Sequence, residues 1–346
     1  MCPQNKLNRS GFEDVVCLDP KERKKVDKVL ALVEKIKKYL DETHATKRKN
    51  EKQFLRRFHS FLVRLNDQSS LISDTSTKIQ IKKVFRKQIE KYISMSPLCH
   101  HGYIKPKGYP GDYKIVEAMY DNQPIATANT MGFLFDQFLL QAEYVQAVRD
   151  RKNAMKEALK KFITSKGSKK LKILNIACGS AREIRELLSE GFSTDKEIEF
   201  VLLDQDKECL DYAKQCLSNC ASNFRFFFVQ SNVYSFFRNK EFNRKFTEFN
   251  FVYSIGLADY LPDLVLEDMI HESFARLTED GKLTIAHKNV REFDSVRSDW
   301  ICDWNFIPRD KRDIQCLIHR CHINKFGICF RYLKTQLIFF FTLQKI

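Results

Sequence analysis

Short apolar runs alternate with amphipathic stretches through the second half of the chain, and this alternation restricts the fold more than any other feature. We expect strands at residues 171–177, 198–203, 224–229, 249–254 and 282–286. We expect helices between them, at residues 182–190, 207–217 and 264–277. Strands that alternate with helices form a parallel sheet covered on both faces, so the predicted fold class is α/β.

The first half of the chain has the spacing of amphipathic helices instead. Apolar residues recur every three or four positions, which predicts helices at 21–41, 51–65 and 77–93. Residues 98–124 are rich in Gly, Pro, Tyr and His and are expected to form an ordered loop, followed by a helix or helix pair at 131–162. We therefore predict a flexible arm at 1–20, a helical cap at 21–165 and an α/β domain at 166–346.

The charge balance is basic, and the cysteines show no metal-binding pattern. Lys and Arg number 59 against 44 Asp and Glu, a formal charge of +15 that suits either acidic partners or a plain basic protein. The 11 cysteines form no pair of CxxC motifs, and the spacing within Cys316–His322 does not fit zinc, so no metal is expected. The polar N-terminus and the lack of an apolar run of ~18–20 residues predict a cytoplasmic protein without a transmembrane segment.

A turn of small residues follows the first expected strand. Gly179 tolerates a positive φ, and Ala177, Cys178 and Ala181 beside it allow a bound nucleoside to approach the backbone closely. The second strand ends in Asp204, 25 positions after Gly179. A carboxylate at that place accepts hydrogen bonds from the two hydroxyls of a ribose.

Polar residues also follow the third and fourth expected strands. The third leads to Asn232 and Val233, where a side-chain amide suits an adenine amino group. The fourth ends at Ser254 and opens into Gly256–Leu261. Open α/β sheets bind their ligands beyond the carboxyl ends of the strands, so these segments are expected to border the same site.

These features resemble, in their order, the class I S-adenosylmethionine (SAM)-dependent methyltransferases over residues 170–290. The resemblance implies a Rossmann-like sheet, SAM as cofactor, a transferase of class EC 2.1.1.- and antiparallel last strands at 327–331 and 336–342. The chain departs from the family at Asn175, where the family has Asp or Glu, and at Ala177 and Ala181, where it has Gly. The cofactor-binding residues implied are Asn175, Ala177, Cys178, Gly179, Ala181, Asp204, Gln205, Asn232, Val233 and Ser254.

A closer resemblance rests on Lys105–Tyr113 (KPKGYPGDY), Ala177–Glu183 (ACGSARE) and Gly256–Leu261 (GLADYL). These segments are similar to those of a bacterial subgroup known as 3-hydroxypalmitic acid methyl ester biosynthesis proteins, and the similarity extends from about residue 97 to the end. It implies carboxyl O-methylation of a long-chain 3-hydroxy fatty acid. A fatty acid or an acidic acyl carrier protein is then the expected partner, whereas nucleic acid is not.

Candidate catalytic residues follow from the chemistry of methyl transfer, an in-line displacement in which the acceptor must be held against the methyl group. A carboxylate acceptor needs no strong base, whereas a hydroxyl or amine does. We predict catalytic roles for Tyr113, Asp259 and Tyr260. Predicted substrate residues are Tyr109, Asp112, Arg149 (with Arg151 beside it) and, as a general base, His287.

Each of these residues has a structural alternative, and so does the function. Asp259 suits a helix N-cap, His287 a hydrogen-bonded core position, and the two arginines a solvated helix face. Methylation of the oxygen or nitrogen of another metabolite stays open. A non-catalytic SAM-binding or interaction module also stays open, because Asn175, Ala177 and Ala181 depart from the usual first motif.

Overall fold

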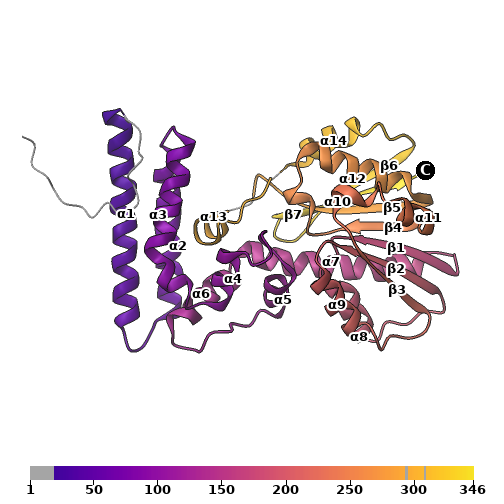
Figure 1. Ribbon diagram of the computed structural model, residues 1–346, viewed down its shortest axis with the longest axis horizontal. Helices are drawn as coiled ribbons and strands as arrows, with labels where there is room; N and C mark the ends of the chain where they lie inside the picture. The colour runs from indigo at the N-terminus through magenta and orange to yellow at the C-terminus, as the bar shows by residue number, and fades with distance from the viewer. Residues whose placement is uncertain (1–18, 293–294, 308) are drawn as a thin grey trace, which may run out of the picture. The chain divides into compact units, whose positions relative to one another are not determined.

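The computed structural model describes residues 19–292, 295–307 and 309–346, without the side chains of 240 and 241. The chain divides into two compact units, each described below by itself (Figure 1). The first holds the described residues of Met1–Pro110, Asn122–Ala142 and Asp294–Asn305. The second holds those of Gly111–Asp121, Glu143–Phe293 and Phe306–Ile346. Most of the arm predicted at 1–20 lies outside the described residues.

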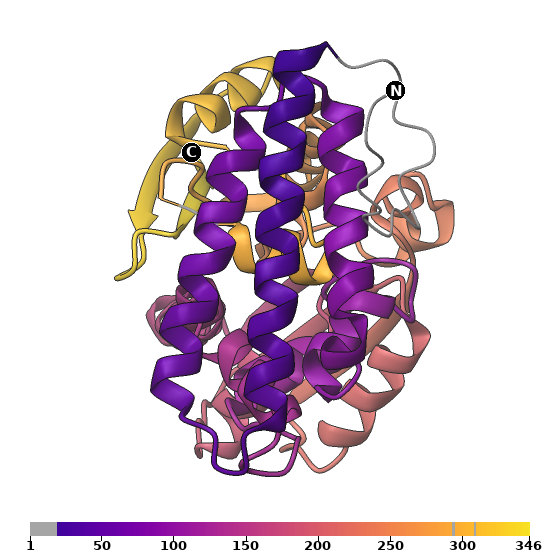
Figure 2. The ribbon, with the colours of Figure 1, turned by 90° about the vertical axis from the view of Figure 1, so that its left-hand side faces the viewer.

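The first unit is helical, as expected. Its helices are α1 (Pro20–Ala45), α2 (Glu51–Ser70), α3 (Thr75–Ile93), α4 (Pro97–Ile104), α6 (Met131–Leu140) and α13 (Val296–Cys302). The three long helices lie side by side (Figure 2), and each begins with an Asp or Asn whose side chain accepts a backbone N–H of the first turn. Four phenylalanines of α2 and α6 fill the centre: Phe54, Phe58, Phe135 and Phe138.

Helix α13 belongs to this helical unit although it follows the fifth strand in sequence. The indole N–H of Trp300 donates to Asn66 Oδ1 over 3.2 Å, and its ring meets Phe85 edge-on. Asp299 forms an ion pair with Lys82. The unit is therefore built from segments far apart in the chain. Contact units need not coincide with folding domains, so the boundary expected at 165/166 stays a prediction.

The ordered loop expected at 98–124 is wrong in part, because it contains two helices. Pro97 begins α4 rather than ending the helical region, since proline is well tolerated at the first position of a helix and Ser96 caps it. Asp112 accepts the N–H groups of Lys114 and Ile115 at the start of α5 (Tyr113–Asp121). The helix pair expected next is present as α6 and α7 (Glu143–Ser165).

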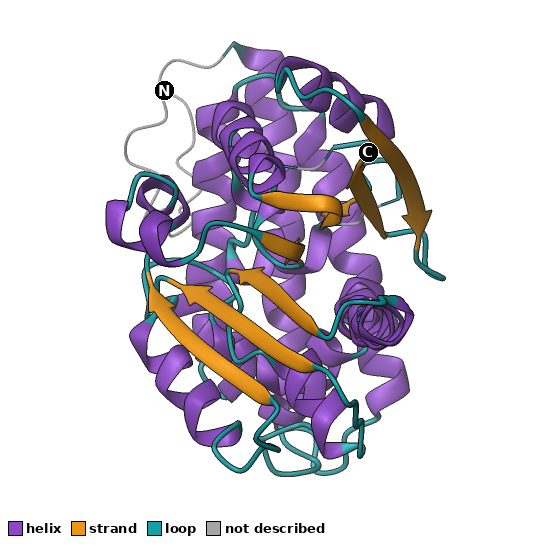
Figure 3. Ribbon diagram, turned by 90° about the vertical axis from the view of Figure 1, so that its right-hand side faces the viewer, coloured by secondary structure: helices purple, strands orange, loops and turns teal. Residues whose placement is uncertain are grey.

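The second unit is a seven-stranded sheet in the order β3-β2-β1-β4-β5-β7-β6, whose strands run side by side in Figure 3. The first five strands are parallel, and β7 is antiparallel to both β5 and β6. The bounds are β1 (Lys170–Ile176), β2 (Glu197–Asp204), β3 (Phe224–Gln230), β4 (Phe249–Ser254), β5 (Leu277–Lys288), β6 (Phe326–Tyr332) and β7 (Ile338–Lys345). The predicted α/β class, the Rossmann-like sheet and the antiparallel last strands are confirmed.

Helices cover the sheet on both faces. Figure 1 shows α8 (Arg182–Ser189) and α9 (Lys207–Cys216) on one side, and α12 (Asp263–Ala275) and α14 (Lys311–Arg320) on the other. Shorter helices are α10 (Val233–Phe236), α11 (Lys240–Lys245) and the 3-10 turn η1 (Ala258–Tyr260). Strand β5 begins at Leu277, five residues before the strand expected at 282–286, and its register with β4 shifts between Phe249 and Phe251. Among the described residues, no helix combines the length and the apolar character that crossing a membrane requires.

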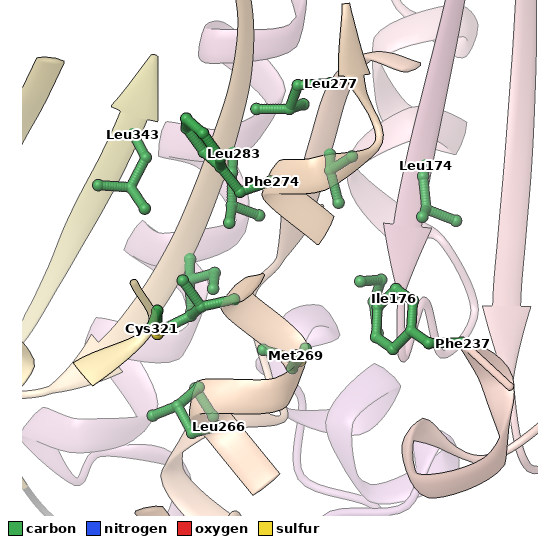
Figure 4. Close-up of a cluster of buried hydrophobic side chains, with 14 of the residues drawn as sticks. Leu174, Ile176, Phe237, Leu266, Met269, Phe274, Leu277, Leu283, Cys321 and Leu343 are labelled. Atoms are coloured by element: carbon green, nitrogen blue, oxygen red, sulfur yellow. The ribbon is translucent and has the colours of Figure 1, made fainter. Parts of the chain in front are cut away.

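An apolar core packs the strands against α12. Figure 4 shows Leu174 and Ile176 of β1, Leu283 of β5 and Leu343 of β7 in one cluster with Met269 of α12, all of them buried. The strand order reverses between β1 and β4, because β2 and β3 follow on one side and β5 on the other. Ligands of open α/β sheets bind at such a reversal, beyond the carboxyl ends of the strands.

Gly132 offers a test of packing in the helical unit. A Cβ at this position would lie 2.0 Å from the carbonyl oxygen of Met95. Gly132→Ala should therefore lower the free energy of unfolding by about 1–3 kcal/mol, although alanine is the better helix former. Both tryptophans, Trp300 and Trp304, lie in this unit, so urea unfolding followed by tryptophan fluorescence reports on it.

The matched control is Gly167→Ala, since a Cβ there meets no atom within 4 Å. Equal unfolding midpoints for the two variants would contradict the packing described at Gly132.

Candidate functional site

The turn after β1 has the backbone conformation that the sequence predicts for a close approach to a ligand. Ala177, Gly179 and Ala181 have φ values of 54°, 52° and 52°. The N–H of Cys178 donates to the carbonyl of Leu203 over 2.9 Å, which ties the turn to the end of β2. A non-glycine residue in the left-handed region costs about 1–2 kcal/mol, so both alanines hold a strained conformation that the surrounding sheet stabilises.

Asp204 links this turn to the end of β2. Its Oδ2 accepts the N–H of Gly179 over 2.8 Å, and its Oδ1 accepts the N–H of Asp206 over 2.9 Å. Burial raises the pKa of this carboxyl, although both backbone bonds oppose the shift. Each oxygen has a second lone pair, so the carboxylate can accept further hydrogen bonds from a ligand. The neighbouring Gln205 is exposed.

Asn175 stands where the methyltransferases that the sequence resembles have Asp or Glu. The buried carboxylate of Glu183 lies beside it. Asn175 Nδ2 donates to Glu183 Oε1 over 2.9 Å, and the hydroxyl of Tyr253 donates to the same oxygen over 2.7 Å. Burial raises the pKa of Glu183, and both hydrogen bonds oppose that shift. Sequence reasoning missed Glu183 and Tyr253 as site residues. The signal was present, since Glu183 ends the Ala177–Glu183 segment on which the family resemblance rests.

The two arginines of α7 differ in their surroundings. Arg149 donates to the side chain of Gln146 and, over 3.1 Å, to the carbonyl of Met119. Arg151 is 6% exposed, and its Nε has no hydrogen-bond partner. It lies at the end of β4, because a Cβ added to Gly256 would be 3.7 Å from its Nη2. Its charge acts on both Glu183 and Asp259.

Helix α5 is anchored to the turn after β1 by Glu117. This carboxylate accepts from the hydroxyl of Ser180, from Arg182 Nη1 over 2.8 Å and from Arg185 Nη1 over 3.1 Å. At the start of the same helix, the Tyr113 hydroxyl donates to Glu208 over 3.1 Å. The segment Gly111–Asp121 therefore packs on the candidate cofactor site. Tyr109, predicted as its companion, belongs to the helical unit.

Asp259 and His287 meet in a buried cluster with Lys288 and Arg309. Asp259 Oδ1 accepts the N–H of Lys288 over 2.7 Å, and its Oδ2 accepts Lys288 Nζ over 2.8 Å. His287 bonds through Nδ1 to the Lys288 carbonyl, over 2.9 Å, and through Nε2 to Arg309, over 3.0 Å. Both carboxylate oxygens of Asp259 and both ring nitrogens of His287 thus have hydrogen-bond partners.

The charges of this cluster shift the ionisation of its members. Burial opposes ionisation of Asp259, but Lys288, His287 and Arg151 outweigh it and lower the pKa of Asp259 to about 2. Burial lowers the pKa of Lys288 to about 8, and attraction to Asp259 only partly offsets it. Burial likewise lowers the pKa of His287. Asp259 therefore stays ionised at neutral pH and holds β5 next to η1.

The remaining predicted residues lie at the strand ends. Ser254 is buried, and its hydroxyl donates to the carbonyl of Ile176 over 2.9 Å, which clamps β4 to β1. Asn232 is exposed and caps α10 by accepting the N–H of Ser235, and Val233 is half-buried after it. The Tyr260 ring contacts that of Phe306 at 5.3 Å. The roles of these residues in binding or catalysis stay predictions.

No protein-family model matches the chain, and no curated protein matches it in sequence. A solved structure described as a possible exported protein from Bordetella parapertussis is similar over 95% of this chain and 99% of its own, with 13% identity and a TM-score of 0.54. This similarity shows a shared fold.

Two methyltransferases are also among the similar solved structures. Magnesium protoporphyrin IX methyltransferase from Synechocystis PCC 6803 with bound SAM matches 60% of this chain and 86% of its own, with 11% identity and a TM-score of 0.42. A SAM-dependent methyltransferase of the DUF858 family from Leishmania major matches 75% and 91%, with 14% identity and a TM-score of 0.42.

Removal of the Asp259 charge should destabilise the sheet unit strongly at neutral pH. Asp259→Asn leaves Lys288 buried without its partner, and breaking a buried pair costs about 3–5 kcal/mol. Because the pKa of Asp259 is about 2 when folded and ~3.9 when unfolded, its contribution is present above pH ~4 and is lost as the pH falls towards 2. Urea unfolding at pH 7 and at pH 3, followed by circular dichroism, measures both effects.

Asp211→Asn is the control, because Asp211 pairs with Lys207 on the surface with 61% of its side chain exposed. Such a pair contributes less than about 1 kcal/mol. If Asp259→Asn costs no more than Asp211→Asn at pH 7, the buried pair does not have the role described.

Proposed function

We propose that this chain is a SAM-dependent methyltransferase (EC 2.1.1.-) that acts on a small molecule. The observation that supports this proposal most is the strained turn Ala177–Ala181. It is hydrogen-bonded to the Asp204 carboxylate at the point where the strand order reverses. A carboxylate beside a turn of small residues suits a ribose that lies against the backbone. SAM would supply the methyl group, and the chain would hold its ribose with Asp204.

The chemistry of the donor set fits SAM. Asn175 near the end of β1 and Glu183 on α8 offer acceptors to an ammonium group, and Arg151 offers donors to a carboxylate. Asn232 and Val233 follow β3, on the adenine side of the expected cofactor position. Gly179 has no side chain, and a Cβ added there would meet no protein atom within 4 Å. The space beside the turn is therefore open. We assign cofactor binding to these residues together with Ala177, Cys178, Ala181, Gln205 and Ser254.

A carboxylate is the methyl acceptor that this site supports best. Asp259 and His287, the strongest candidates for a general base, are each bonded on both polar atoms. An acceptor that is already anionic needs no proton removal, so their engagement does not hinder it. Methylation of a hydroxyl or an amine would need another base, of which Tyr113 is the remaining candidate. The positions that hold the acceptor are proposed to include Asp112, Tyr113 and Tyr260.

The finer proposal is a long-chain 3-hydroxy fatty acid, free or carried by an acidic acyl carrier protein. It rests on the segments KPKGYPGDY, ACGSARE and GLADYL and on the formal charge of +15. A basic surface favours approach of an anionic acceptor or an acidic carrier. A cytoplasmic location stays a prediction of the sequence.

Cofactor binding is tested first, by titration calorimetry with SAM. The chain should bind SAM with a Kd in the micromolar range, and Asp204→Ala should weaken binding at least tenfold through loss of the ribose bonds, about 1.4 kcal/mol or more. Asp204→Asn keeps a side chain that can hold the turn, so its affinity for SAM should lie between that of the unaltered chain and that of Asp204→Ala. Asp211→Asn should bind like the unaltered chain. No binding by the folded, unaltered chain would refute the proposed function and favour an interaction module.

The acceptor is tested with tritium-labelled methyl-SAM and 3-hydroxypalmitic acid. A carboxyl methyl ester releases labelled methanol in mild base, whereas a methyl ether or an N-methyl product does not. We expect base-labile product with 3-hydroxypalmitic acid and none with its amide, because the amide lacks the anionic oxygen. Base-stable product from either compound would contradict carboxyl methylation and indicate methylation of another oxygen or nitrogen.

A further inference from the structure

The last strand of the sheet has an open outer edge. Strand β6 stands at the end of the strand order and pairs on one side, with β7. The N–H of Leu333 donates to the carbonyl of Ile338, and the N–H of Ile346 donates to that of Lys325, each over 2.9 Å. Backbone groups alternate in direction along an antiparallel ladder, so the odd-numbered residues bond to β7. The N–H and C=O groups of the even-numbered residues of β6 therefore point away from the sheet.

Apolar side chains are exposed along the same strand. Ile328 and Tyr332 are 40% and 36% exposed, and Cys329 between them is exposed as well. In β3, the strand at the other edge, the exposed residues are the polar Arg225 and Gln230. An exposed apolar edge is a template for pairing with another strand. Of the two edges of the sheet, β6 is thus the one that suits a partner strand.

The sequence of β6 is complementary to itself. Cys329 is the middle residue of the strand. If two copies pair antiparallel with Cys329 on the two-fold axis, Phe326 lies opposite the partner's Tyr332. In the same register, Ile328 lies opposite the partner's Phe330. These side chains share one face of the strand, because they are two residues apart, so each apolar side chain meets an apolar one across the axis.

Charge selects this register. Lys325 and Arg331 are exposed cations on the other face of the strand. With Cys329 on the axis, Arg331 lies opposite the partner's Gly327, which has no side chain. A register with Ile328 on the axis would set Lys325 directly opposite the partner's Arg331. Like charges directly opposite each other destabilise a sheet, so the register centred on Cys329 is favoured over that one.

The same register brings two thiols together. The backbone of Cys329 bonds to β7, so across the axis the two Cys329 residues form a pair without mutual backbone hydrogen bonds. The Cα atoms of such a pair are about 4.5 Å apart. Disulfides join residues whose Cα atoms are about 4.4–6.8 Å apart. A disulfide at Cys329 therefore reports both on the pairing and on its register.

We infer that two copies of this chain form a symmetric dimer through β6, in which their sheets join edge to edge. Each copy uses its β6 edge once, so the assembly closes at two chains. The inference is independent of the proposed function, because the candidate cofactor residues lie on other elements than β6. The formal charge of +15 on each copy opposes association, so added salt should strengthen the dimer.

Sedimentation of the full chain under reducing conditions tests the dimer. A species of twice the 40.8 kDa chain mass should increase with protein and salt concentration. Ile328→Lys places a charge in the apolar row and should raise the Kd of the dimer at least tenfold. Gln230→Lys adds the same charge to the exposed end of the other edge strand, so this matched control should dimerise like the unaltered chain.

Cross-linking tests the register and does not depend on the folding of Ile328→Lys. The chain used has Ser in place of Cys216 and Cys316, the other exposed thiols of the described residues, and of Cys2 and Cys17, which lie outside them. Diamide oxidises two thiols to a disulfide and takes up their two electrons and two protons. It should give a covalent dimer, and Cys329→Ser should abolish that product.

Moving the thiol sharpens the test. In the chain with Cys329→Ser, the further changes Gly327→Cys and Arg331→Cys should each give no cross-link alone. A mixture of the two should cross-link, because these positions lie opposite each other across the axis.

Three results would overturn the inference. The first is a chain that stays monomeric at every protein and salt concentration. The second is a dimer with the same Kd in Ile328→Lys as in the unaltered chain, since the copies would then meet elsewhere. The third is a cross-link from Gly327→Cys or Arg331→Cys alone, which would require another register.

Discussion

The parallel pairing of β1 with β2 on one side and β4 on the other is the constraint on which the candidate site depends. The register sets Ile176 opposite Leu203 and Asn175 opposite Tyr253. The turn after β1 consequently meets Asp204 on one side and the end of β4 on the other. Side chains from α7 and α8 reach the same point, since Arg151 lies beside Gly256 and Glu183 bonds to Asn175 and Tyr253. Without that pairing, neither the bond between Asp204 and the turn nor the buried polar group would be assembled.

Buried charge is concentrated at this point, and its members are held by one another. Asp259 receives two bonds from Lys288, His287 lies between the Lys288 carbonyl and Arg309, and Glu183 receives bonds from two strands. Satisfied polar networks in a low-dielectric interior are rigid, because any displacement breaks several bonds at once. Such rigidity presents donors and acceptors to a ligand in fixed positions, which reduces the ordering that binding requires.

The periodicity of apolar residues predicts most of the fold, because burial on a strand or on a helix face leaves a regular mark in the sequence. The long helices, the parallel strands and the turn at Gly179 follow from it. Contacts between distant segments leave no such mark. The position of Trp300 among α2 and α3 could not be predicted, nor the bonds that give Asp259 and His287 their partners. Pro97 is compatible with the end of one helix and with the start of another, and only the cap at Ser96 decides.

For the candidate site, residues in a local motif were predictable and residues brought in by tertiary packing were not. Gly179 and Asp204 lie at strand ends that the pattern locates. Glu183 lies within the same motif, but its meeting with Asn175 and Tyr253 depends on how α8 packs against β1 and β4. Glu117 is 63 residues from Ser180, and their bond depends on how α5 packs within the sheet unit.

The insertion of α13 into the helical unit has a consequence for synthesis on the ribosome. Asn66, Lys82 and Phe85 emerge early, whereas their partners Asp299 and Trp300 emerge after five strands of the sheet. Translation at ~5–20 residues per second delays that meeting by roughly 10–40 seconds. Until the late segment arrives, the residues of α2 and α3 that α13 contacts are without these partners. A fragment that ends before residue 295 would leave these contacts unmade, so expression of the helical unit as an N-terminal fragment removes part of its own core.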